Sequence, residues 1–243
     1  MSDKNMSARI NLDRLQGGLR TKRFGKWIVF LREVGSTNDY AKELASYGAP
    51  EGTVVIAETQ TAGRGRLGRE WVSPKGGLYF SIVLRPKLSA SEAVKLVFVA
   101  GLAVAKVLDE VYGIRVETKW PNDVLVNGKK ICGILSEMNT TAEKVNYAIV
   151  GIGLNANVDV EKKFQGQLKA VVTSLKNELG RRVPLEELFR IILERLENKY
   201  DLYINEGFSS VLQKWKKYAV DEKIERFREL NEPSQARRRT KNT

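Results

Sequence analysis

Short runs of apolar residues, separated by polar and glycine-rich turns, form the main pattern along the first two-thirds of the chain. The runs have the length of strands and are rich in β-branched and aromatic residues, which predicts β-strands. They cover residues 27–31, 53–57, 78–84, 114–119, 124–126, a stretch that ends at residue 135, and residues 146–152. Asn127-Gly128 stands between two of these runs and is the strongest short signal for a β-hairpin.

Helical patterns separate the blocks of strands. The first predicted helix begins at a capping box of Ser36 and Asp39 and ends near Gly48. A second capping box, Ser89 with Glu92, begins a long apolar helix that continues to about residue 112, and residues 170–218 are again helical in pattern. Because the strands mostly follow one another as hairpins, we predict an α+β fold with a mixed, largely antiparallel sheet covered by helices.

The same pattern divides the chain into three segments. Residues 1–26 are polar, basic and weakly patterned, and we interpret them as an arm. Residues 27–220 contain the predicted strands and helices and form one domain. Residues 221–243 indicate a charged helix or disorder, followed by an arginine-rich tail. Since clusters of like charge at chain ends are usually solvated, we expect both ends to be disordered.

The amino-acid composition restricts the cellular compartment in which we expect the protein. Of the 243 residues, 42% are hydrophobic and 29% are charged, as is usual for soluble globular proteins. No apolar run is long enough to span a membrane, and the N-terminus has no apolar signal segment. The single cysteine, Cys132, cannot form an internal disulfide and is interpreted as a core residue. We therefore expect a cytoplasmic protein without membrane contact.

The chain contains no histidine and carries a formal net charge of +12. The absence of histidine excludes Ser-His-Asp and Cys-His nucleophilic catalysis, and with one cysteine it argues against a zinc site. Any chemistry must therefore depend on Lys, Arg, Asp, Glu, Ser, Thr or backbone groups. The positive charge favours anionic partners such as phosphates, nucleic acid or an acidic protein.

A segment rich in glycine and arginine, residues 60–69, is the first candidate site. Its glycines are Gly63, Gly65 and Gly68, and its arginines are Arg64, Arg66 and Arg69. The glycine spacing matches the dinucleotide-binding fingerprint, but that fingerprint must open a helix, and the following Pro74 and Gly76-Gly77 forbid one. A Walker motif is also absent from the sequence. The segment indicates either an anion-binding loop or a flexible surface loop with incidental charge.

Two more motifs follow in the second half of the chain. Residues 119–123, Lys-Trp-Pro-Asn-Asp, lie between two predicted strands and by themselves indicate only a turn. Residues 128–135 contain two successive lysines, Lys129 and Lys130, on an otherwise apolar strand. The two must point to opposite faces of the sheet, and the alternation does not tell which of them faces the functional side.

Taken together, the motifs resemble those of the biotin protein ligases. The matching pieces are residues 36–38 (STN), 60–69 (QTAGRGRLGR) followed by Trp71, 119–123 (KWPND), 128–135 (GKKICGIL) and 151–155 (GIGLN). Each piece is weak alone, but all five occur in the family's order and spacing across about residues 25–218. The resemblance implies a fold similar to the catalytic core of class II aminoacyl-tRNA synthetases.

The resemblance also implies substrates and site residues. ATP, with Mg²⁺, would activate biotin as biotinyl-5'-AMP, and the biotinyl group would pass to a lysine of a biotin carboxyl carrier domain. Contacts with biotin are implied for Ser36, Thr37, Asn38, Gln60, Gly63, Arg64, Gly65, Arg66, Lys130 and Gly133. Contacts with the nucleotide are implied for Arg66, Arg69, Trp71, Asn122 and Asn155. The catalytic set would be Lys130, Arg64, Arg66 and Asp123, and the family's lysine matches Lys130, not Lys129.

A physical argument agrees with this chemistry. A carboxylate that attacks the α-phosphate of ATP brings two anions together, so cations such as Lys130 and Arg66 are needed between them. In the second step Asp123 could align the incoming lysine amine, and an ordered Arg/Gly loop would exclude water. Positioned charge of this kind needs no histidine. The sequence identifies no metal ligands.

The chain departs from the family at both ends. Members that double as repressors carry an N-terminal helix-turn-helix domain, and the family usually closes with a small SH3-like β domain; neither pattern is present here. We therefore expect no operator binding, while the effect on ATP binding and carrier docking stays open, and the resemblance allows a homodimer. The alternatives are a lipoate–protein ligase, a basic nucleic-acid-binding module, and an inactive paralogue that only binds biotin or the carrier.

Overall fold

A mixed β-sheet forms the centre of the protein in a computed structural model, which describes residues 10–142 and 144–220. Over these residues the sheet has seven strands in the order β1-β2-β3-β7-β6-β5-β4. The strands are β1 (Ile28–Val34), β2 (Val54–Gln60), β3 (Leu78–Leu84), β4 (Glu117–Lys119), β5 (Asp123–Val126), β6 (Lys129–Thr141) and β7 (Lys144–Leu154). Strands β1 and β2 pair in parallel, and the neighbouring pairs from β2 to β4 are antiparallel. The predicted fold class is confirmed.

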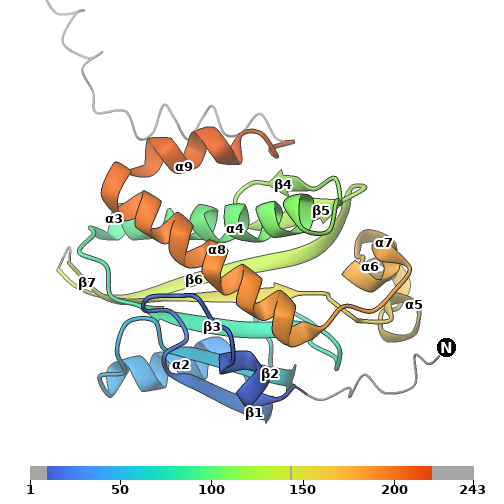
Figure 1. Ribbon diagram of the computed structural model, residues 1–243, viewed down its shortest axis with the longest axis horizontal. Coiled ribbons are helices and arrows are strands. Elements are labelled where there is room, and N and C mark those ends of the chain that lie inside the picture. The colour runs from blue at the N-terminus through green and yellow to red at the C-terminus, as the bar shows by residue number, and fades with distance from the viewer. Residues whose placement is uncertain (1–9, 143, 221–243) are drawn as a thin grey trace, which may run out of the picture.

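Helices cover both faces of this sheet (Figure 1). They are α1 (Leu12–Gln16), α2 (Thr37–Ser46), α3 (Ala90–Ala93), α4 (Leu96–Glu110), α5 (Val160–Lys163), α6 (Gly166–Val171), α7 (Leu175–Leu179), α8 (Leu185–Glu206) and α9 (Phe208–Trp215). Helix α2 packs on Val55, Val83 and Ile149, while α4 and α8 pack on residues of the opposite face such as Ile56 and Ile82. The alternation of side chains along each strand therefore serves two cores, a small one under α2 and a large one under α4 and α8.

The local signals in the sequence correspond to real turns and caps. Ser36 caps α2 by accepting the backbone N–H of Asp39, and Ser89 with Glu92 forms a reciprocal capping box at α3. Asn127 and Gly128 both have positive φ, 51° and 72°, in the hairpin between β5 and β6. The predicted long helix from Ser89 is interrupted between α3 and α4, and residues 114–116 lie outside β4, whose partner β5 is itself short.

Residues 10–26 pack on the domain and do not form the solvated N-terminal arm that we expected. Leu15 and Phe24 are fully buried in the main core. The backbone N–H groups of Lys22, Arg23 and Phe24 all donate to the carboxylate of Glu197 on α8, at 2.6, 2.7 and 3.0 Å. Two apolar anchors and one buried acidic residue therefore hold a segment whose own charge pattern suggested disorder. The remainder of the expected arm, residues 1–9, and the expected tail, residues 221–243, lie outside the described residues.

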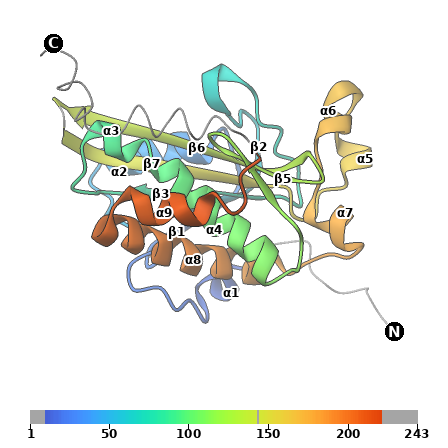
Figure 2. The ribbon, with the colours of Figure 1, turned by 90° about the horizontal axis from the view of Figure 1, so that it is seen from above.

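Two features of the fold prepare the site. The loop 61–77 between β2 and β3 projects from the layers of sheet and helices (Figure 2) and contains one short 3₁₀ turn, η1 (Arg66–Gly68). The segment between β7 and α7 contains α5 and α6, which the sequence pattern did not predict. In the described part of the chain, no helix is long and apolar enough to cross a membrane.

Candidate functional site

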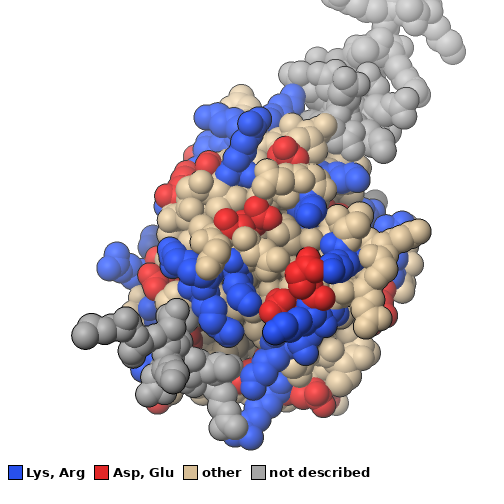
Figure 3. Space-filling view, turned by 90° about the vertical axis from the view of Figure 1, so that its right-hand side faces the viewer, with Lys and Arg blue, Asp and Glu red and all other residues tan. Residues whose placement is uncertain are grey.

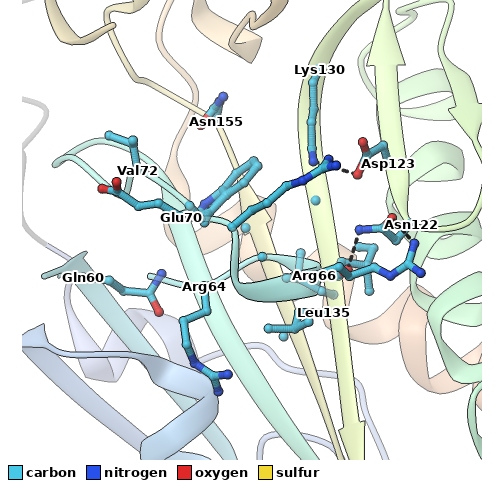
Figure 4. A pocket seen from close by; sticks show the side chains of 18 of the residues that line it. Gln60, Arg64, Arg66, Glu70, Val72, Asn122, Asp123, Lys130, Leu135 and Asn155 are labelled. Carbon is cyan, nitrogen blue, oxygen red and sulfur yellow. Dashed lines mark hydrogen bonds and ion pairs between the residues drawn. The ribbon is translucent and has the colours of Figure 1, made fainter. Parts of the chain in front are cut away.

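A cavity of about 360 Å³ lies between the sheet, the loop 61–77 and the segment that contains α5 and α6. A volume of this size is in the range of small-molecule sites. The sequence-predicted residues that line it are Ser36, Thr37, Asn38, Gln60, Arg64, Gly65, Arg66, Arg69, Trp71, Asn122, Asp123, Lys130, Gly133 and Asn155. Residues far apart in the sequence thus surround one space, and Figure 4 shows how several of them face it.

The floor of the cavity is formed by the start of α2 and the end of β2. Thr37 donates its backbone N–H to Gln60 Oε1 at 2.8 Å, and Gln60 Nε2 donates to Ser73 Oγ at 2.8 Å. Asn38 lies against Gly151 of β7 so closely that a Cβ at position 151 would overlap Asn38 Oδ1. The floor therefore requires a glycine at position 151 and side chains whose hydrogen bonds fix their orientation.

The glycine- and arginine-rich loop folds back on itself as a small antiparallel turn. The backbone N–H of Gly65 donates to Arg69 O at 2.7 Å, and that of Trp71 donates to Gly63 O at 2.9 Å. No helix follows, so the rejection of a dinucleotide fingerprint is confirmed. Gly63 does not line the cavity; a Cβ there would overlap Trp71 O, so this glycine shapes the loop instead.

Lys130 from β6 and Arg66 from the loop 61–77 both line the cavity. Lys130 Nζ forms an ion pair with Asp123 at 2.7 Å, and Arg66 donates to Asn122 Oδ1 at 3.2 Å (Figure 4). Lys129, the neighbouring lysine, is exposed and does not line the cavity. The tertiary structure thus resolves the choice that the alternation left open, because β6 presents Lys130 to the cavity.

Arg64 is held away from the two other cations. Its guanidinium donates to Asp39 at 2.5 Å and to Glu137 at 3.0 Å, and Figure 4 shows it pointing away from Lys130 and Arg66. Two carboxylates therefore neutralise its charge. Glu137 also accepts from Asn38 and Lys42. Burial raises the pKa of Glu137, but these hydrogen bonds and the charges of Lys42 and Arg64 outweigh it, so the pKa is lowered from its ordinary value.

Trp71 covers the strands beside Lys130. The indole ring lies on Gly133 and Gly153, where a Cβ would come within 3.0 Å and 2.5 Å of it, and Lys130 Nζ is 5.2 Å from the ring centre. Trp71 Nε1 is buried without a hydrogen-bond partner among the described residues. A buried donor without a partner is costly, and it marks a position where a ligand atom could accept.

The far end of the cavity is apolar and incomplete. Asn155 is 1% exposed, and it donates through Nδ2 to Thr173 O at 3.1 Å, but its Oδ1 is buried and has no partner in the described part of the chain. The wall here consists of residues that sequence reasoning missed, Phe164, Leu168, Val171 and Val172. Their segment shows only weak apolar periodicity, so no strong signal was available.

Two groups in or near the site have no catalytic potential of their own. Cys132 is fully buried, and burial raises the pKa of its thiol far above the ordinary value, which confirms its interpretation as an inert core residue. Within residues 10–142 and 144–220, no group of three or more His, Cys, Asp or Glu side chains could hold a metal ion by itself.

The sheet order, with helices on both faces and a cavity under a projecting loop, is the class II aminoacyl-tRNA synthetase-like fold found in biotin protein ligases. Residues 30–155 match the model of the biotin/lipoate A/B protein ligase family. The chain belongs to this family.

Individual relatives agree with that membership. The chain is 39% identical over 204 residues to the bifunctional ligase/repressor BirA of Bacillus subtilis, a match that covers 84% of this chain and 62% of BirA. It is 38% identical over 192 residues to the biotin–[acetyl-CoA-carboxylase] ligase of Paracoccus denitrificans, covering 76% and 78% of the two chains. The structure of the Aquifex aeolicus biotin protein ligase in complex with biotin and ATP superposes with a TM-score of 0.69 at 33% identity, covering 80% and 79%.

Proposed function

We propose that the protein is an ATP-dependent biotin–protein ligase. It would form biotinyl-5'-AMP and transfer the biotinyl group to a lysine of a biotin carboxyl carrier domain. The main support is that one cavity combines a polar floor, two cations from different elements, and an apolar end where a buried amide oxygen has no partner among the described residues. These are the features needed for an acid with a polar head, for two anions that must meet, and for a nucleotide base.

In the first step, a carboxylate oxygen of biotin attacks the α-phosphorus of ATP, and pyrophosphate leaves. Lys130 and Arg66 would lie between the carboxylate and the phosphate and reduce their repulsion, which grows as the bond forms. Asp123 forms an ion pair with Lys130 Nζ at 2.7 Å and so holds it oriented before substrates bind. The contribution of such preorganised charge is typically about 10²–10³-fold in rate for one group.

In the second step, a neutral lysine amine of the carrier attacks the carbonyl carbon, and AMP leaves with its electron pair. The amine nitrogen must lose a proton, and the carboxylate of Asp123 is the candidate acceptor in this part of the cavity. Trp71, which lies across Gly133 and Gly153, would shield the anhydride from water on the side of the sheet.

Magnesium would enter with the nucleotide phosphates. Mg²⁺ keeps several waters and usually takes one or two protein carboxylates, so it does not need a protein cage. The carboxylates that line the described cavity are Glu70 and Asp123, and Asp123 is paired with Lys130. Glu70 is therefore the side chain that could add a ligand, and the ion would neutralise charge on the phosphates.

The cellular setting belongs to the proposal as well. We propose a cytoplasmic enzyme, in which residues 27–220, with residues 10–26 packed into their core, form the catalytic domain. An acidic carrier would be its protein partner, with the option of a homodimer. Nucleic acid is not a proposed partner: on the face in Figure 3, Lys and Arg side chains lie in several groups separated by acidic ones. A continuous basic surface would be expected of a nucleic-acid-binding module.

The direct test measures ATP-dependent transfer of biotin to a carrier domain, together with pyrophosphate release. We expect both in the wild type. Lipoic acid replaces biotin in a parallel reaction, and a lipoyl product without a biotinyl one would contradict the proposal. Tight biotin binding without pyrophosphate release would identify an inactive paralogue instead.

A further inference from the structure

Hydrogen bonds on the cavity floor determine which groups can still meet a ligand. Gln60 Oε1 accepts from the backbone N–H of Thr37, a group that can only donate. This identifies the oxygen and the nitrogen of the Gln60 amide without ambiguity. Nε2 gives one hydrogen to Ser73 Oγ, so one N–H of Gln60 remains. Toward the cavity, Gln60 is therefore a donor.

Asn38 has the opposite character. Its Nδ2 donates to Glu137 Oε2 at 2.8 Å and to Leu135 O at 3.4 Å, which uses both of its hydrogens. The fully buried Ser81 Oγ has one hydrogen and lies 2.6 Å from Asn38 Oδ1 and 2.8 Å from Thr37 Oγ1, so Oδ1 accepts at most one hydrogen from it and keeps at least one lone pair. Asn38 is itself only 4% exposed. Toward the cavity, Asn38 can thus only accept a hydrogen bond.

Glu137 is the group that imposes this orientation on Asn38. An ionised carboxylate only accepts, so the amide of Asn38 must turn its nitrogen toward it. Glu137 is kept ionised by Lys42, at 2.5 Å, and by Arg64, at 3.0 Å. A neutral amide at position 137 could instead donate to Asn38 Oδ1 and allow the reversed orientation. Leu135 O also only accepts, but it lies 3.4 Å from Nδ2, so the carboxylate of Glu137 at 2.8 Å is the stronger determinant of the orientation.

We infer that Glu137 is a positioning residue that determines the specificity of the acid site, an inference that rests on the proposed function. It fixes Asn38 as an acceptor beside the Gln60 donor. An acceptor next to a donor is the complement of a cyclic urea, which presents a ring N–H beside a carbonyl oxygen. The dithiolane ring of lipoic acid offers neither group and would leave both floor amides unpaired.

The size of the effect follows from the cost of unpaired buried groups. A site built to hydrogen-bond a polar group rejects a ligand that lacks it, because the buried partners lose their bonds. For one orphaned amide group, a loss of about tenfold to a hundredfold in affinity is expected. A change that lets the Asn38 amide reverse its orientation should therefore weaken biotin binding by about that factor and leave the binding of lipoic acid unchanged.

The test is calorimetric titration of the full chain with biotin and with lipoic acid, in the wild type and in Glu137→Gln. We expect Glu137→Gln to bind biotin at least about tenfold more weakly while its affinity for lipoic acid stays within about twofold. A merely structural role for Glu137 would weaken both ligands alike. Asp39→Asn is the matched control, because it removes a partner of Arg64 and leaves the Asn38 amide untouched.

A rescue variant separates orientation from charge. In the double variant Asn38→Asp with Glu137→Gln, the carboxylate at position 38 can only accept and the amide at position 137 donates to it. The negative charge stays near Lys42 and Arg64. Recovery of binding in this variant would therefore show that the loss in Glu137→Gln does not come from misfolding. We expect biotin affinity to return to within about threefold of the wild type.

A further arm needs no variant. Biotin methylated on one or the other ring nitrogen is titrated into the wild type, and one of the two isomers should lose at least about tenfold in affinity. The inference is overturned if both isomers bind like biotin, or if Glu137→Gln loses biotin and lipoic acid to the same degree. Failure of biotin to bind the wild type at all would instead overturn the proposed function.

Discussion

The two ends of the cavity differ in how complete they are. At the floor, Gln60 and Asn38 have partners on nearly every polar atom, and Ser81 and Glu137 hold them in place. At the far end, Asn155 Oδ1 is buried without a partner in the described structure, and Leu168 and Val171 are 43% and 55% exposed. The polar groups of the floor are therefore preorganised without a ligand, whereas we expect a ligand to pair the free oxygen and cover the apolar side chains of the far end. Each end predicts a different response to substitution.

The largest effect is expected between the two ends, where the anions meet. Lys130→Ala removes the cation that β6 presents to the cavity, and we expect the rate of pyrophosphate release to fall about 10³-fold. Lys129→Ala is the matched control on the opposite face of the strand and should stay within about twofold. Single-turnover kinetics with biotin and ATP measure both. Equal losses in the two variants would remove Lys130 from the mechanism.

Breaking the rigid floor should give the next largest effect. Gly151→Ala places a Cβ on Asn38 Oδ1, and a well-packed floor cannot move to accept it. We expect biotin affinity to fall about a hundredfold, while the affinity for ATP alone changes by less than about threefold. Titration calorimetry with each substrate separately gives the comparison. If both affinities fell together, the two ends would not be independent.

A substitution at the far end should affect ATP and leave biotin binding unchanged. Asn155→Ala removes the unpartnered Oδ1, and we expect the KM for ATP to rise about tenfold with the Kd for biotin unchanged. The variant also leaves Thr173 O without its donor, so thermal unfolding is measured beside the kinetics. A KM for ATP that equals the wild-type value would mean that this oxygen does not meet the nucleotide.

The smallest effect is expected at the apolar wall. Leu168→Ser removes an exposed apolar side chain that we expect to cover the nucleotide, and it should raise the KM for ATP about threefold to tenfold. Stability should change little, because the side chain is 43% exposed. An exposed apolar residue outside the cavity, Val94, supplies the control as Val94→Ser. Equal shifts in both variants would argue for a general surface effect.

Local signals in the sequence were sufficient for much of the fold. The prediction for residues 78–84 matches β3, because a run in which every residue but Ser81 is apolar suits a strand buried on both faces. The capping box at Ser89, the helix cap at Ser36 and the Asn127-Gly128 hairpin were also confirmed, since such turns depend on the residues within them, but Asp39 does not make the reciprocal bond of the box predicted at Ser36. Of the site residues predicted through family motifs, all but Gly63 line the cavity, but the motifs missed the wall of Phe164, Leu168, Val171 and Val172, and the individual roles stay proposals.

Long-range contacts decided the rest. The packing of residues 10–26 depends on Glu197, which lies more than 170 residues away, and no local pattern could predict it. The pairing of Arg64 with Asp39 and Glu137, and the wall from α5 and α6, likewise join segments that only the sheet brings together. The sequence by itself determined the elements, their turns and the residue types of the site, because these depend on near neighbours. Which lysine faces the cavity, which arginine is neutralised and which way Asn38 points were decided by the tertiary structure, because charges and hydrogen bonds act through space.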